Sequence, residues 1–141
     1  MEGRREILER ICQQSGVVTL YIFGSQAQKV RDWLAGLKDD LPKGSSDVDV
    51  GVRSLSGKSW SIAEKVSLAM ALEDLFDGMR ADLVLLSEAD PFLAAEIIRG
   101  ERLYARDEHE TDEYDLYILR RAGDLLPLER ERMSLVLGEP K

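Results

Sequence analysis

An apolar run followed directly by glycine and serine is the feature that most constrains how this chain folds. Val17–Phe23 is rich in β-branched and aromatic residues and shows no clean alternation of apolar and polar side chains. That pattern is typical of a strand that is covered on both faces. Gly24 then permits a tight turn, and Ser25 offers an N–H and a hydroxyl at the expected start of a helix, where phosphates bind readily. We therefore expect a central strand that ends in a phosphate-binding turn.

A second extended segment carries two carboxylates on one face. Side chains alternate along a strand, so Asp47 and Asp49 share one face while Val48 and Val50 share the other. Neighbouring carboxylates repel each other, and a divalent cation removes that conflict. Mg²⁺ favours a few carboxylate oxygens together with substrate phosphates, so the pair predicts a metal site beside the turn. Taken alone, an Asp-x-Asp is more often a solvated strand edge.

The remaining periodicity predicts an α+β chain with a mixed sheet. Apolar residues at helical spacing, bounded by caps and by glycine or proline, predict helices over Arg4–Gln14 and Gln26–Leu37, from the capping box at Ser61 to near Gly78, and from Asp90 to Gly100. Further strands are expected at Ala81–Leu86 and, at an edge, Arg102–Ala105. Asp82 lies in the first of these, where a buried charge would need a partner.

The last segment, residues 111–137, is helical and charged in pattern. We expect it to break or kink before Pro127, because proline has no N–H to continue the helix. Tyr114 and Tyr117 are expected to cover apolar surface. The face made by Tyr114, Ile118 and Leu125 is a candidate partner surface, since a terminal amphipathic helix has few other places to dock.

Composition limits the classes of function. The 141 residues suit a single domain, and the one cysteine, Cys12, excludes an internal disulfide and is expected in the core. No secretory or membrane-spanning stretch is present in the pattern, so a cytoplasmic protein is expected. The formal net charge of −8 argues against direct nucleic-acid binding and favours basic protein partners or metal-complexed anions. His109 lies in a charged run and is expected at the surface.

The order of these features resembles that of the DNA polymerase β superfamily of nucleotidyltransferases. The resemblance rests on a strand ending in Gly24-Ser25, a strand carrying Asp47 and Asp49, a helix, and a strand carrying Asp82. Small size and the segments Ala81–Leu86 and Ala94–Tyr104 are similar to those of the minimal nucleotidyltransferase, or MNT, family. The likeness covers most of the chain and implies one nucleotidyltransferase domain, 1–141, with a mixed sheet backed by helices.

The resemblance implies a role for each matched residue. Gly24 and Ser25 would contact the β- and γ-phosphates of a nucleoside triphosphate, ATP. Asp47, Asp49 and Asp82 would be catalytic and would hold two Mg²⁺ ions. Many family members are antitoxins that transfer AMP to a tyrosine of a HEPN-domain ribonuclease toxin, so such a toxin is the expected partner, in a homo- or hetero-oligomer.

The chain departs from the family pattern between the turn and the carboxylates. Residues Gln26 to Ser46 separate them, a longer link than is usual, and they include Trp33. We expect Trp33 to pack on the sheet, because aromatic side chains bury large areas. The cations near the site in sequence are Lys29, Arg31, Lys43 and Arg53.

Two alternatives remain open at this stage. The first is a non-catalytic antitoxin that keeps the fold and neutralises a toxin by occlusion, although intact carboxylates argue against it. The second is a nucleotidyltransferase that acts on RNA or a small molecule, although the expected single domain and its negative charge do not favour RNA.

Overall fold

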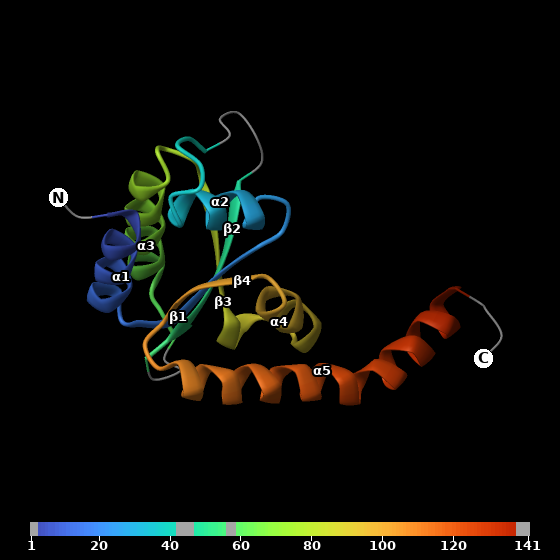
Figure 1. Ribbon diagram of the computed structural model, residues 1–141. Coiled ribbons are helices and arrows are strands. Elements are labelled where there is room, and N and C mark those ends of the chain that lie inside the picture. Colours follow the sequence, from blue (N-terminus) through green and yellow to red (C-terminus); the bar gives the residue numbers. More distant parts are fainter. Residues whose placement is uncertain (1–2, 42–46, 56–58, 138–141) are drawn as a thin grey trace.

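The structure is a computed structural model that describes residues 3–41, 47–55 and 59–137. Four strands, five α-helices and a short 3₁₀ turn make up this part of the chain (Figure 1). In order they are α1 (Arg4–Ser15), β1 (Val17–Phe23), α2 (Ala27–Leu34), β2 (Val48–Ser54), α3 (Ile62–Leu75), β3 (Ala81–Leu85), η1 (Leu86–Glu88), α4 (Pro91–Ile98), β4 (Glu101–Ala105) and α5 (Glu108–Leu137).

The strands form one mixed sheet in the order β3-β2-β1-β4. β1 runs antiparallel to both β2 and β4, whereas β2 and β3 are parallel. All seven residues of β1 are buried, which confirms the prediction of a central strand covered on both faces. The sheet therefore has β3 and β4 at its edges and the strand that carries the Gly-Ser turn inside it.

Helices cover both faces of the sheet and create two cores. In Figure 1, α1 and α3 lie on one side of the strands, and α4 with the first half of α5 lies on the other. Leu20 and Ile22 of β1 pack into the first core, and Tyr21 and Phe23 pack into the second. This arrangement confirms the predicted α+β fold, because the alternation of β1 side chains serves both layers.

Local signals in the sequence fix several helix starts. Ser61 and Glu64 form the predicted capping box, with a 3.1 Å bond from the Glu64 N–H to Ser61 Oγ and a 3.1 Å bond from the Ser61 N–H to Glu64 Oε1. Asp90 caps α4 by accepting 2.9 Å bonds from the N–H groups of Phe92 and Leu93.

The inserted segment contributes a short helix to the first core. α2 ends at Leu34, three residues earlier than predicted, and residues 42–46 of the predicted loop lie outside the described residues. Trp33 is 2% exposed and meets the Phe76 ring edge-on at 6.1 Å, so the prediction that it packs in the fold is confirmed. Cys12 is also buried in this core, as expected.

Helix α5 agrees with the prediction only in part. It does not break at Pro127, but Figure 1 shows it changing direction in its second half, which agrees with the predicted kink. The proposed partner face is wrong: Ile118 is buried in the second core with Tyr114 packed beside it, because α5 covers α4 and β1. Tyr117 does not cover apolar surface as expected, since it is 56% exposed.

Polar contacts fasten the first half of α5 to the sheet. Tyr21 donates to the Asp115 carboxylate, and Arg53 forms an ion pair with Glu110. Burial, followed by the hydrogen bond to Asp115, raises the pKa of the Tyr21 hydroxyl.

Among the helices that the structure describes, none is both long enough and apolar enough to span a lipid bilayer.

Candidate active site

The turn after β1 meets the beginnings of β2 and β3. Since β1 and β2 are antiparallel, the last residue of β1, Phe23, lies opposite Asp49 in the pairing. Since β2 and β3 are parallel, Asp49 in turn lies opposite Asp82. Residues that are far apart in the sequence, at the ends of three different strands, are thus placed at one edge of the sheet.

Gly24 lies against the carboxylate of Asp49. Its φ is +77°, in the left-handed region that side chains other than glycine rarely adopt. A Cβ at this position would overlap Asp49 Oδ2 and would stand 3.4 Å from Asp49 Cγ. The glycine is therefore required twice over, by the backbone conformation of the turn and by the space that the carboxylate occupies.

Like charges surround Asp49. Its pKa is raised, first by burial and then by the carboxylates of Asp82, Asp47 and Glu96. Asp47 is exposed and directly precedes β2, and Asp49 is half-buried within it. The site therefore has the electrostatic character of a cation site, because a bound positive charge would relieve the repulsion on Asp49.

Asp82 does not lie in a buried position. Contrary to the expectation of a buried charge that needs a partner, its side chain is exposed. β3 lies at the edge of the sheet, and Leu85 is the only one of its five residues that is buried, so the start of the strand at Asp82 is open to solvent. Asp82 is thus accessible to a substrate that approaches the site from solvent.

The residues after Gly24 lead into α2. Ser25 is exposed, and the Ala27 N–H donates a 3.3 Å bond to the Gly24 carbonyl. Gln26 is only 4% exposed, and its Oε1 has no hydrogen-bond partner among the described residues. Ser25 is therefore the side chain of this turn that is open to a ligand.

One acidic residue near the site was not predicted. Glu96 projects from α4 and is exposed, and its charge acts on Asp49. It belongs to the segment that carried the resemblance to minimal nucleotidyltransferases, but its sequence position alone gives no indication that α4 faces β2. Gly51 shows how close that packing is, because a Cβ there would overlap Ile97 Cγ2.

The cationic side chains that lie near the site in the sequence differ in their surroundings in the structure. Arg31 pairs with Asp32 at 3.2 Å and with Glu101 at 3.0 Å, and Arg53 is engaged by Glu110. Lys43 lies outside the described residues. Lys29 is exposed on α2, next to the turn, and makes no ion pair within the part of the chain that the structure describes. It is therefore the most available of these cations for an anion at the turn.

The acidic residues fit Mg²⁺ in chemical type. Within residues 3–41, 47–55 and 59–137, no group of three His, Cys, Asp or Glu side chains is arranged closely enough to hold a metal by itself. Mg²⁺ does not require such a group, since it is commonly held by one or two carboxylates plus substrate phosphates and water. The site suits that mode of binding, because the carboxylates around Asp49 repel one another and the adjoining turn is a place for phosphates.

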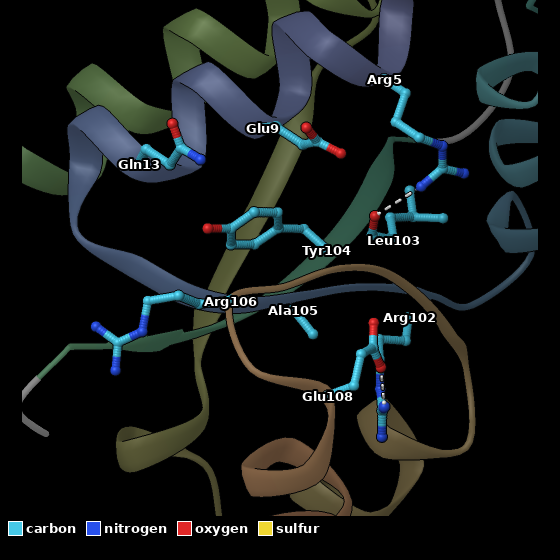
Figure 2. Close-up of a pocket in the computed structure, with 9 residues that line it drawn as sticks. All are labelled: Arg5, Glu9, Gln13, Arg102, Leu103, Tyr104, Ala105, Arg106 and Glu108. Atoms are coloured by element: carbon cyan, nitrogen blue, oxygen red, sulfur yellow. Dashed lines mark hydrogen bonds and ion pairs between the residues drawn. The ribbon is translucent and has the colours of Figure 1, made fainter.

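A separate polar groove lies between α1 and β4 (Figure 2). It has a volume of about 350 Å³, and Arg5 on its wall donates a 3.3 Å bond to the Leu103 carbonyl. Tyr104 stands in its middle, with Glu9 of α1 on one side (Figure 2). The described residues that line the groove include none of the predicted site residues, so it is distinct from the acidic edge.

Solved structures with this fold include toxin–antitoxin complexes. A toxin–antitoxin complex with AMP-PNP contains a chain that is 17% identical, with a TM-score of 0.71 over 94% of this chain and 98% of that one. A complex of a tri-AMPylated HEPN toxin of Shewanella oneidensis with an MNT antitoxin gives 15% identity and a TM-score of 0.67, covering 95% and 96%. A protein described as a minimal nucleotidyltransferase is 27% identical, with a TM-score of 0.51 over 70% and 85%.

Sequence comparison identifies the family. No curated protein shows significant similarity to this chain. The family model described as "Polymerase beta, Nucleotidyltransferase" matches residues 6–109, which include the turn, both strands that carry aspartates, and the whole sheet. The match extends over most of the chain and agrees with the fold of the solved structures. The chain therefore belongs to the polymerase β nucleotidyltransferase family.

Proposed function

We propose that this chain is a Mg²⁺-dependent nucleotidyltransferase that moves AMP from ATP to a tyrosine hydroxyl of a HEPN ribonuclease toxin. The observation that carries the proposal is the placement of Asp49, between the Gly24 turn on one side and Asp82 on the next strand. Within the family, this combination of a phosphate-binding turn and carboxylates suits the attack of an acceptor hydroxyl on the α-phosphate of ATP, which transfers AMP to the acceptor.

Each residue then has a chemical role. The Ser25 N–H and hydroxyl bind the β- and γ-phosphates, and Gly24 keeps the backbone close to them. Asp47, Asp49 and Asp82 hold two Mg²⁺, which when bound neutralise the triphosphate and favour ionisation of the attacking hydroxyl. Asp82, exposed at the edge of the sheet, orients that hydroxyl and accepts its proton.

The reaction is an in-line displacement at phosphorus. The tyrosine oxygen forms a bond to the α-phosphorus while the bond from this phosphorus to the bridging oxygen of the β-phosphate breaks. Pyrophosphate leaves with the pair of electrons from that bond. The toxin retains AMP on its tyrosine, and the protein returns to its initial state once Asp82 loses the proton.

The choice of a toxin as acceptor rests on the solved structures and on charge. Chains with this fold occur in toxin–antitoxin complexes, one of which contains a tri-AMPylated HEPN toxin. A ribonuclease must attract a polyanion, so its surface is expected to be basic. The net charge of −8 on this chain suits association with such a partner.

The test uses ATP labelled at two different positions. The purified chain, Mg²⁺ and a candidate HEPN toxin from the same organism are incubated with ATP labelled at the α- or the γ-phosphate. We expect the α label, and not the γ label, to appear on a tyrosine of the toxin, and to be absent with Asp47→Asn/Asp49→Asn. No α label on the toxin would overturn the proposal. If both proteins still neutralised the toxin, occlusion would be the mechanism.

A further inference from the structure

Helix α5 carries an exposed stripe that the fold does not use. The stripe consists of Tyr117, Arg121, Asp124 and Leu128, which follow one another at intervals of four, three and four residues. Such spacing places all four on one side of a helix. Tyr117 is 56% exposed and Leu128 65% exposed, and both charged residues are exposed as well. The stripe lies beside the face that packs on the sheet, which is formed by Ile118 and Ala122.

The order of residues in the stripe is self-complementary. An apolar residue stands at each end, and a base and an acid stand between them. If two copies of α5 cross antiparallel about a two-fold axis between Ala122 and Gly123, Tyr117 of each copy meets Leu128 of the other. The same axis brings Arg121 of each copy to Asp124 of the other, so each contact occurs twice.

We propose that this stripe is the contact surface between two copies of this chain, which associate through antiparallel α5 helices. The order of the charges within the stripe, and not the net charge of the chain, points to a second copy as the occupant. Each chain has a net charge of −8 and would repel its copy over most of its surface, whereas the stripe is neutral and its charges are in complementary order. Within the described residues, neither Arg121 nor Asp124 has a hydrogen bond or ion pair, so both are available for pairing.

The geometry of α5 is compatible with this contact. The axis falls on the N-terminal side of Pro127, before the helix changes direction (Figure 1). Beyond that point the helix extends away from the rest of the molecule in the same view. Its outer part also exposes Leu135, which is 69% exposed and lies seven residues beyond Leu128, on the same side of the helix. A pairing of α5 with a second copy would shield apolar surface that this chain does not cover itself.

The test measures the mass of the chain in solution. It compares the wild type with variants in which the charge at Arg121 or Asp124 is reversed, and with a variant in which the two charges are exchanged. Sedimentation equilibrium at about 0.15 M salt limits non-specific electrostatic repulsion. We expect a dimer for the wild type. Arg121→Asp and Asp124→Arg should each raise the dissociation constant by about tenfold or more, because each creates two like-charge contacts in the dimer. The exchange Arg121→Asp/Asp124→Arg should restore wild-type association.

A matched control comes from the same helix. Arg130 is nine residues from Arg121, which is two and a half turns, so it points in the opposite direction. Arg130→Asp should leave the dissociation constant unchanged, and circular dichroism should show an intact fold for all variants. A chain that is monomeric at every concentration, or an exchange variant that stays as weak as the single variants, would overturn the proposal. So would single reversals that weaken only the binding of the toxin. The label transfer test is independent of this result.

Discussion

Replacing Gly24 by alanine tests whether the turn and Asp49 work as one unit. The substitution has two separate costs. Alanine at a φ of +77° is strained by about 1 kcal/mol. In addition, its Cβ would overlap Asp49 Oδ2, so either the carboxylate or the turn must move. We expect the free energy of unfolding to fall by about 1–2 kcal/mol, and the Tm to fall by about 4–8 °C.

The effect on activity should be larger than the effect on stability. Displacement of a catalytic group by about 1 Å can reduce a rate roughly 100-fold. We therefore expect AMP transfer by Gly24→Ala to fall about 100-fold or more at saturating ATP, at a temperature where the variant is fully folded. Label transfer gives the rate, and thermal unfolding followed by circular dichroism gives the Tm.

Gly16 supplies a matched control for backbone strain. Its φ is +73°, nearly the same as that of Gly24, but a Cβ there would meet nothing within 4 Å. Gly16→Ala should therefore lower the Tm by about 4 °C and leave transfer unchanged. The reasoning is refuted if Gly24→Ala transfers AMP as fast as Gly16→Ala does, since the contact with Asp49 would then have no role.

Three further predictions concern the site and the packing that supports it. Asp49→Asn should abolish transfer yet raise the metal-free Tm at pH 7, because the raised pKa means that ionised Asp49 destabilises the fold. This gain in Tm should vanish in acid, where the wild-type carboxyl is protonated in both the folded and the unfolded state. Gly51→Ala should lower the free energy of unfolding by about 2 kcal/mol, because the new methyl group forces Ile97 aside. The loss should be smaller in an Ile97→Ala background, and urea unfolding of the two single variants and the double variant measures the difference. Tyr21→Phe should lower the free energy of unfolding by about 1 kcal/mol in the same assay, because it removes the hydrogen bond to Asp115. An unchanged midpoint of urea unfolding would contradict this prediction.

The central strand and the acidic pair were accessible from the sequence because both follow from local rules. A run such as Val17–Phe23 has few alternatives to a buried strand, and alternation alone assigns Asp47 and Asp49 to one face. Capping residues such as Ser61 and Asp90 likewise determine helix starts through bonds to their own helix.

Other features depend on how distant segments meet, and no local rule supplies that. The parallel register that sets Asp49 opposite Asp82 is determined by packing of the whole sheet. The approach of Glu96 to Asp49 requires α4 to lie over β2. The outward stripe of α5 was missed for a similar reason, since a helix with apolar residues on two sides does not show which side meets the sheet.

Covalent silencing of the toxin is the most direct test of the proposed function. The toxin is incubated with this chain and Mg²⁺, with or without ATP, then separated from it under conditions that dissociate the complex, and its ribonuclease activity is measured. We predict that the toxin recovered after incubation with ATP stays inactive, whereas toxin recovered without ATP, or from Asp47→Asn/Asp49→Asn, is fully active. Full activity after every incubation would contradict the account and leave inhibition by binding alone.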